Sequence, residues 1–149
     1  MKINIASSRV LHLLISPQHA KDDAESDTST PDARTQVDDV SNAGEERQAF
    51  FGARVKFFDN FFCVVFKTEI HTDEGMCVDL EYESRFNINV PVDEEFKSSN
   101  FPYVNAPAIA YPYLRAFISN LTLNAGFAPV MLPSLNFVAM KDKIKAASV

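Results

Sequence analysis

Residue types that commonly carry out chemistry are few in this chain of 149 residues, and their spacing does not indicate a reaction. The three histidines, His12, His19 and His71, do not stand at metal-ligand spacing from a cysteine or an acid, and Cys63 and Cys77 form no Cys-x-x-Cys pair. With only four glycines, the sequence has neither a phosphate-binding loop nor a Gly-x-Ser-x-Gly motif. We therefore expect no enzyme activity, no metal site and no cofactor.

The remaining reactive groups have structural explanations. Glu81 and Glu83 lie on the polar side of an alternating segment, which is typical of a solvated strand face. Two cysteines are too few for a disulfide framework, so we expect both to be reduced, small hydrophobic side chains within strands.

The chemistry that the sequence does support is the non-directional contact of large apolar side chains. Four phenylalanines, Phe57, Phe58, Phe61 and Phe62, surround an Asp-Asn pair. Residues 126–135 are also apolar, yet three breakers (Gly126, Pro129, Pro133) exclude regular structure there. Because such a segment is too apolar to stand in water, it must lie on an apolar surface. After it, Phe137, Met140 and Ile144 recur at helical spacing on a short helix that needs a docking surface. Together these elements predict a lid on a hydrophobic groove.

The negative charge is confined to one segment. Residues 18–48 hold nine of the twenty acids and three of the fourteen bases, so the rest of the chain has eleven of each. The segment has no aromatic residue and cannot bury enough apolar surface to offset its ordering entropy. We predict a flexible internal loop, either a solvated insertion or a mobile arm over a binding surface. No basic stripe is present, so nucleic acid is not an expected partner.

Four segments have the pattern of strands, at residues 3–16, 51–57, 61–71 and 76–90, and Thr72–Gly75 by composition is a turn closing a hairpin. Alternation is clear in the fourth segment and fails in the third. There the core face is formed by Phe62, Val64 and Phe66, and the opposite face is also apolar because it carries Phe61, Cys63 and Val65. That apolar opposite side is covered by a helix, covered by a second subunit, or open for binding.

The segment from Pro107 to Gly126 predicts the main helix. Proline suits a first turn, so Pro107 or Pro112 marks the start, and Gly126 supplies a left-handed cap. A stripe at i, i+3, i+4 spacing forms the expected core face: Ala110, Tyr113, Leu114, Phe117 and Leu121. A second, mixed face carries Tyr111, Arg115, Ile118 and Thr122, which suits packing between subunits.

No run of 18 apolar residues occurs, so we expect no membrane insertion. The early apolar run from Val10 to Ile15 is interrupted by His12 and lacks a small-residue cleavage site, so no signal peptide is expected. The expected location is the cytoplasm, and we expect one domain spanning residues 1–149.

Three C-terminal motifs resemble the SecB family of protein-export chaperones. The family pattern is a Phe/Tyr-Pro-Tyr-x-Arg helix, a Gly-x-x-Pro loop and then Asn-Phe. In this sequence the three elements are Tyr111-Pro112-Tyr113-Leu114-Arg115, Gly126-Phe127-Ala128-Pro129 and Asn136-Phe137. The similarity is strongest over residues 105–139 and looser but collinear over residues 50–90.

The resemblance implies an α+β fold, a four-stranded antiparallel sheet with the C-terminal helices packed on one face. It further implies a homotetramer, built as a dimer of dimers that sandwich their long helices, and an ATP-independent holdase that binds unfolded polypeptides in apolar grooves. We place the client groove between the four phenylalanines and the lid: Phe57, Phe58, Phe61, Phe62, Phe127, Met131, Leu132, Phe137, Met140 and Ile144. By the resemblance, the subunit-packing helix contributes Tyr111, Leu114, Arg115 and Ile118.

Departures from the family pattern bear on the partners. Export members often carry an acidic tail for docking on the motor SecA, whereas this sequence ends in the basic stretch around Lys141–Lys145. The acidic strand face, Asp79, Glu81 and Glu83, is an alternative docking surface. Other SecB-like proteins hold an antitoxin within a toxin–antitoxin–chaperone system. The expected clients are therefore preproteins or an antitoxin, and the alternative function is a non-chaperone adaptor or structural oligomer on the same fold.

Overall fold

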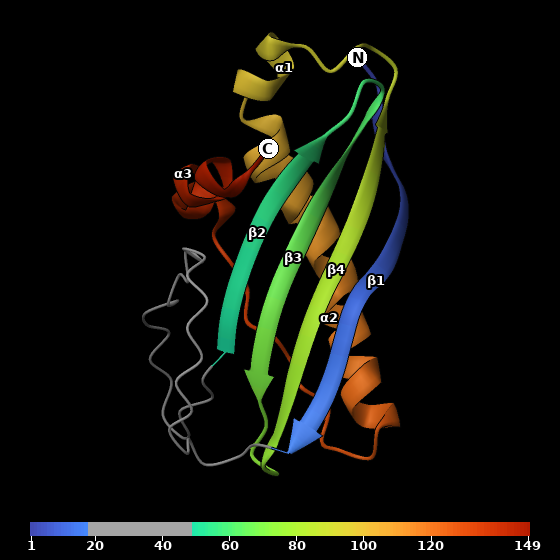
Figure 1. The fold of residues 1–149 in the computed structure, drawn as a ribbon, viewed down its shortest axis with the longest axis vertical. Coiled ribbons are helices and arrows are strands. Elements are labelled where there is room, and N and C mark those ends of the chain that lie inside the picture. The colour runs from blue at the N-terminus through green and yellow to red at the C-terminus, as the bar shows by residue number, and fades with distance from the viewer. Residues whose placement is uncertain (18–48) are drawn as a thin grey trace, which may run out of the picture.

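The computed structural model describes residues 1–17 and 49–149; the acidic segment 18–48, with the flexible loop predicted there, lies outside the described residues. In the described part, the elements follow in the order β1 (Ile3–Pro17), β2 (Ala49–Phe57), β3 (Phe61–His71), β4 (Met76–Ile88), α1 (Glu94–Ser98), the π-helical segment η1 (Phe101–Asn105), α2 (Ala106–Asn124) and α3 (Phe137–Ala147). Figure 1 shows the strands as one twisted layer, with α2 crossing behind it and α3 beside β2. The predicted fold class, a four-stranded antiparallel sheet with helices on one face, is confirmed.

The four strands form a sheet in the order β1-β4-β3-β2, antiparallel throughout. The predicted hairpin joins β3 to β4 through Thr72–Gly75, where Gly75 has a φ of 77°, a conformation that side chains with a Cβ rarely adopt. The Met76 carbonyl accepts the Thr72 amide at 2.8 Å and closes the turn. This short turn fixes the register, in which His71 lies opposite Cys77 and Glu69 opposite Asp79.

Alternation along the strands separates two faces, which we call the helix face and the open face. On the helix face Phe62 pairs with Phe86 and Phe66 with Tyr82, and the two phenylalanines of β3 have no exposed surface. On the open face Phe61, Cys63 and Val65 alternate with them, and no helix among the described residues covers that side (Figure 1). The open-face residues Cys63 and Val65 are nevertheless buried.

Helix α2 begins at Ala106 with Pro107 in its first turn, and Pro112 lies inside the helix rather than at its start. The buried stripe is Ala106, Ala110, Tyr111, Leu114, Ile118 and Thr122. The predicted stripe shares Ala110 and Leu114 with it, and Phe117 and Leu121 are half-buried against the same core. The prediction for Tyr113 is wrong, since that side chain is exposed. Both stripes have helical spacing. The crossing angle of the helix on the sheet selects one of them, and periodicity alone does not supply that angle.

Helix α3 closes one edge of the sheet. Its N-cap residue Asn136 accepts the amide of Ala139, and Phe137 and Ile144 point into the core. Beyond it, Val149 exchanges two backbone hydrogen bonds with β2, to Val55 at 3.1 Å and to Phe57 at 3.2 Å. Val149 therefore pairs with the edge strand β2, while β1 is the opposite edge strand and pairs with β4 alone among the described strands.

Within the described ranges, every helix is too short or too polar to cross a membrane.

Candidate functional site

The four phenylalanines at the β2–β3 turn are divided between the two faces of the sheet. Phe57 and Phe62 lie on the helix face, where Phe62 stacks on Phe86 with ring centroids 5.1 Å apart. Phe58 and Phe61 lie on the open face and stack on each other at 4.3 Å and 12°. Strand alternation and the tight turn at Asp59 impose this division. The four rings therefore do not form one wall of a single groove.

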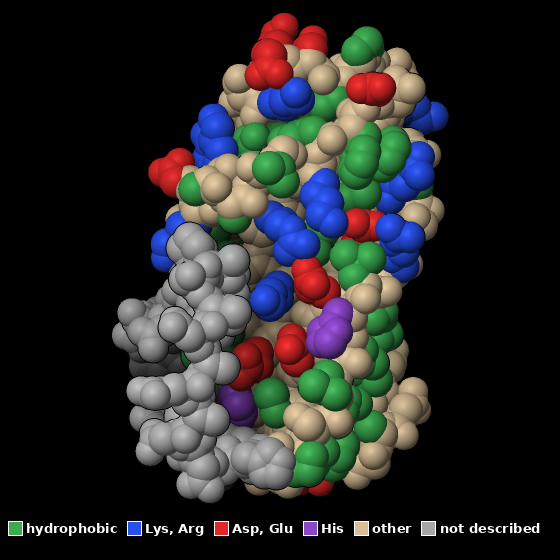
Figure 2. Space-filling view, viewed as in Figure 1, with side chains coloured by type: hydrophobic (Ala, Val, Ile, Leu, Met, Phe, Trp, Pro, Cys, Tyr) green, Lys and Arg blue, Asp and Glu red, His purple; other side chains and the backbone are tan. Residues whose placement is uncertain are grey.

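On the open face, the stacked pair borders a shallow hollow of about 420 Å³. Figure 2 shows basic and apolar side chains intermixed over this part of the face. The hollow is lined by Ser7, Arg9, Lys56, Phe58, Phe61, Cys63, Glu83 and Arg85. The guanidinium of Arg85 lies 3.8 Å from the Phe61 ring centroid, a cation–π contact that holds the ring in place.

Glu83 is the buried charge of this hollow, with 7% of its surface exposed. Arg9 Nε donates to its Oε1 at 2.9 Å, Arg9 Nη2 lies 2.9 Å from the same oxygen, and Lys56 Nζ lies 3.9 Å from Oε2. A carboxylate so far out of water needs such partners. Burial, with Glu83 nearby, raises the pKa of Cys63 to about 11, so this cysteine is a neutral thiol and not a nucleophile.

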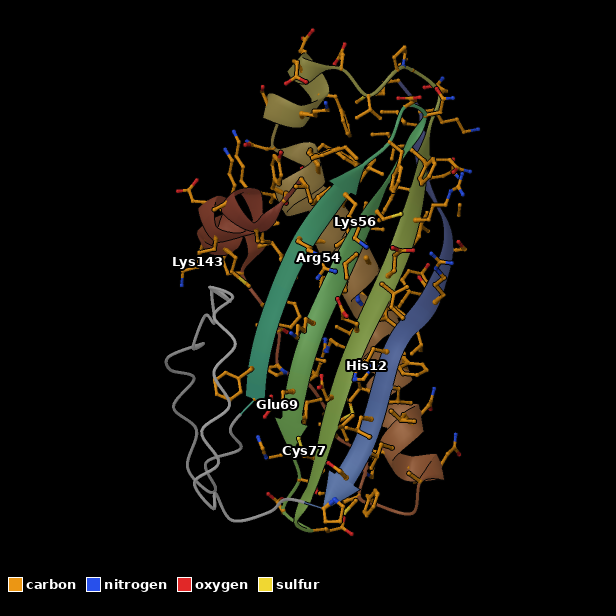
Figure 3. All side chains as sticks on the ribbon, in the orientation of Figure 1. His12, Arg54, Lys56, Glu69, Cys77 and Lys143 are labelled. Carbon is orange, nitrogen blue, oxygen red and sulfur yellow. The ribbon has the colours of Figure 1, made fainter. Side chains whose placement is uncertain are left out.

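The proposed docking carboxylates all lie on the open face and all have partners within the chain. Glu81 accepts from Arg54 Nη2 at 2.8 Å, and Asp79 lies 3.7 Å from His12 Nε2. Figure 3 shows Arg54 and Lys56 on β2 and His12 on β1, the two edge strands of the sheet in which β4 carries these acids. This face is therefore electrically mixed rather than acidic, because Glu81 pairs with Arg54 of β2, Glu83 pairs with Arg9 of β1, and Asp79 lies beside His12 of β1.

On the helix face, the lid segment (residues 126–135) lies over an aromatic floor formed by Phe51, Phe66, Tyr111 and Phe137. Val130 and Leu132 point inward and are buried, whereas Met131 is 65% exposed. The segment has no helix or strand, as predicted, and Gly126 has the left-handed φ of 93° expected at the end of the preceding helix.

Few hydrogen bonds hold the lid segment. The Tyr111 hydroxyl donates to the Pro133 carbonyl at 2.5 Å, and Thr122 Oγ1 accepts the Val130 amide at 2.9 Å. The Ala128 amide donates to the Glu74 carboxylate at 2.8 Å. Burial raises the pKa of Tyr111 to about 12, so its hydroxyl remains protonated as a donor. Apolar packing, supplemented by these side-chain contacts, therefore holds the lid segment on the core.

The predicted site residues thus fall into three groups. Phe62, Leu132, Phe137 and Ile144 are buried in the core, and Phe57, Phe127 and Met140 are half-buried on the same side. Met131 is exposed on the lid segment, while Phe58 and Phe61 belong to the open face. Of the predicted subunit-packing residues, Tyr111, Leu114 and Ile118 are buried against this chain's own sheet, and only Arg115 reaches the surface.

Sequence reasoning missed the exposed apolar residues of β1. Val10, Leu11, Leu13 and Leu14 are each between 38% and 52% exposed along the edge strand. Exposed apolar side chains also stand on α2, at Ile109, Tyr113 and Leu123. The signal in the sequence was the run from Val10 to Leu14, which places apolar side chains on both faces of a strand. A single chain with helices on one face of its sheet cannot bury both faces.

Sequence spacing also missed a cluster of possible metal ligands at the other end of the open face. Glu69, His71 and Cys77 bring one ligand atom each to within 4.8 Å of one another. Figure 3 shows Glu69 and Cys77 close together where β3 ends and β4 begins. The hairpin places them together across two strands, so the cluster has none of the short spacings within one segment that identify metal motifs.

Comparison with known proteins agrees with this architecture. Residues 25–147 match the family described as "Preprotein translocase subunit SecB". An uncharacterized protein of Methanocaldococcus jannaschii is 43% identical over 33% of this chain and 32% of its own length. The protein-export protein SecB of Anaplasma phagocytophilum is 36% identical over 37% of each chain, so the matched regions span about a third of these relatives.

Among solved structures, the fold is similar to that of Rv1957, a SecB-like chaperone of Mycobacterium tuberculosis solved with a ChAD peptide from the HigA1 antitoxin. The TM-score is 0.58 at 17% identity, covering 90% of this chain and 88% of the other. With the family match over most of its length, this chain belongs to the SecB family.

Proposed function

We propose that this chain is an ATP-independent holdase that binds unfolded polypeptide segments at the lid side of the helix face. The observation that carries the proposal is the lid segment itself, which is apolar, irregular and packed over an aromatic floor. Such a surface makes contacts without directional demands and so tolerates many client sequences. The flexible thioethers of Met131 and Met140 suit the same purpose.

The energetics allow a client to replace the lid. Lifting Val130 and Leu132 off the floor exposes two side chains that are worth about 1.5–3 kcal/mol each when buried. A client that inserts two or three apolar side chains into the same place offsets that cost. Further segments of an extended client then bind with a high effective concentration, which raises avidity without any single tight pocket.

The same reasoning supports a homotetramer built as a dimer of dimers. Among the described strands none pairs with the outer side of β1, which carries the exposed Val10, Leu11, Leu13 and Leu14 and is suited to pairing with a second copy. The exposed apolar residues of α2 suit a second contact between two such dimers. In this arrangement, the packing residues are those exposed on α2 together with Arg115.

Two client classes are consistent with the family, namely preproteins for export and an antitoxin. The pairing of Asp79, Glu81 and Glu83 within the chain favours the dedicated antitoxin role, because docking on SecA through these acids would first require breaking their existing contacts. The solved relative that holds an antitoxin peptide is consistent with this choice. Both roles place the protein in the cytoplasm, where such clients are still unfolded.

The test measures the mass of the protein by size-exclusion chromatography with light scattering, alone and with a slow-folding, aggregation-prone polypeptide. We expect the mass of four chains, a shift by one bound client, and suppression of client aggregation without ATP. The same preparation is titrated with SecA and with an antitoxin segment to separate the two roles. A protein that leaves client aggregation unchanged would contradict the holdase and would favour the adaptor on the same fold.

A further inference from the structure

The cluster of Glu69, His71 and Cys77 stands on a rigid part of the sheet. Glu69 and His71 are two residues apart on β3 and share the open face, and Cys77 is the direct cross-strand partner of His71 on β4. The tight turn between the strands holds this pairing. Ligands presented by strands are placed more reproducibly than ligands on loops.

The distances between the three side chains are close to those of a tetrahedral metal centre. Zinc bonds of about 2.0–2.3 Å place tetrahedral nitrogen, oxygen and sulfur ligands about 3.3 to 3.6 Å apart. Here Glu69 Oε1 and His71 Nε2 are 3.0 Å apart, and all three ligand atoms lie within 4.8 Å of one another. A change of roughly 1 Å, within reach of side-chain rotation, would close the site.

The donor set also matches the chemistry of one ion class. A carboxylate, a neutral imidazole and a thiolate together carry two negative charges, which a divalent ion neutralises. Thiolate and imidazole favour zinc and its neighbours over calcium and magnesium, which prefer oxygen ligands only. Asp79, opposite Glu69 in the register, adds a further carboxylate next to the cluster.

We propose that Glu69, His71 and Cys77 bind a zinc-class divalent ion, with water in the fourth position. His71 Nε2 faces Glu69 and is the coordinating nitrogen, while the buried Nδ1 has no hydrogen-bond partner among the described residues. Metal-bound histidines usually donate from their second nitrogen. Since that support is missing here, we expect micromolar rather than nanomolar affinity.

The experiment titrates the full-length protein with Co²⁺ as a spectroscopic substitute for zinc and then displaces it with Zn²⁺. We expect a cobalt–thiolate charge-transfer band that saturates at one ion per chain. Cys77→Ser should abolish the band, and Glu69→Gln should weaken binding at least tenfold. The matched control is Cys63→Ser, the other cysteine on the same face, which should keep the band. Zinc should also raise the melting temperature of the wild type but not of Cys77→Ser.

A second readout avoids substitution altogether. Zinc should slow the alkylation of Cys77 by iodoacetamide in the wild-type protein, as followed by mass spectrometry. The proposal is overturned if no cobalt–thiolate band forms at submillimolar Co²⁺, if the band persists in folded Cys77→Ser, or if Cys77 is alkylated equally fast with and without zinc.

Discussion

Phenylalanine side chains have opposite environments on the two faces of the sheet. On the helix face, Phe62 and Phe66 have no exposed surface and pack against other aromatic rings. On the open face, Phe58 is 45% exposed and stacks on Phe61, whose ring Arg85 contacts. Neighbouring phenylalanines therefore belong either to the core or to a polar hollow according to strand phase. Hydrophobicity alone does not identify a binding residue.

The largest expected difference between the faces is in stability. Phe66→Ala should lower the free energy of unfolding by about 3–5 kcal/mol, because it leaves a cavity in the aromatic floor. Urea denaturation measures this loss, which is a large part of the about 5–15 kcal/mol by which domains are stable. Phe61→Ala is the matched control, with an expected loss below about 1.5 kcal/mol. Equal losses would mean that the open face is as tightly packed as the helix face.

The next effect concerns the charge buried on the open face. Glu83→Gln should cost about 1.5–3 kcal/mol, since it weakens the charge-assisted bonds from Arg9 and leaves two cations with a neutral partner. Chemical denaturation at neutral pH tests this against Glu95→Gln on the exposed first turn of α1, which should change stability by less than about 0.5 kcal/mol. If Glu83→Gln leaves the free energy of unfolding unchanged, water already satisfies the polar side chains that line the hollow.

A third expectation concerns stability in alkali. The pKa of Cys63 is raised from 9.0 to about 11, first by burial and then by Glu83. The unfolded chain thus loses the Cys63 proton near pH 9, whereas the folded chain retains it. The stability that this difference contributes is therefore fully present below pH 9 and is lost as the pH rises to 11. This contribution to the free energy of unfolding amounts to about 3 kcal/mol at most.

Denaturation curves at pH 8, 9, 10 and 11 measure the decline, and Cys63→Ala should reduce it. Tyr111, whose pKa is raised to about 12, accounts for the further loss above pH 10 that this variant retains. An unchanged decline in Cys63→Ala would place the titrating group elsewhere.

The smallest expected effect separates the faces by function. Met131→Ser should weaken client binding by about three- to tenfold, because an exposed apolar contact of the lid segment is lost, and should leave stability nearly unchanged. Fluorescence anisotropy with a labelled unfolded segment measures this. Phe61→Ser serves as the control and should bind clients normally. The reverse pattern would move the client site to the open face.

Much of the architecture was predictable because local signals agreed with one another. Alternation located β4, the composition of Thr72–Gly75 located the turn that precedes it, and breakers at Gly126 and Pro133 located the lid segment. The placement of the groove residues was less predictable. The sequence placed Phe61 and Phe62 in one groove, although consecutive strand residues point to opposite faces. Replacing Phe62 therefore affects the core first.

The sequence by itself determined the four strands, the hairpin turn, the two longer helices and the resemblance to the SecB family. Those properties depend on neighbours along the chain, through turn residues, alternation and helical spacing. Only the tertiary structure decided which stripe of α2 is buried, which carboxylates are already paired, and that His71 faces Cys77 beside Glu69. These depend on crossing angle and register, which are set when distant segments pack and which no short window of sequence contains.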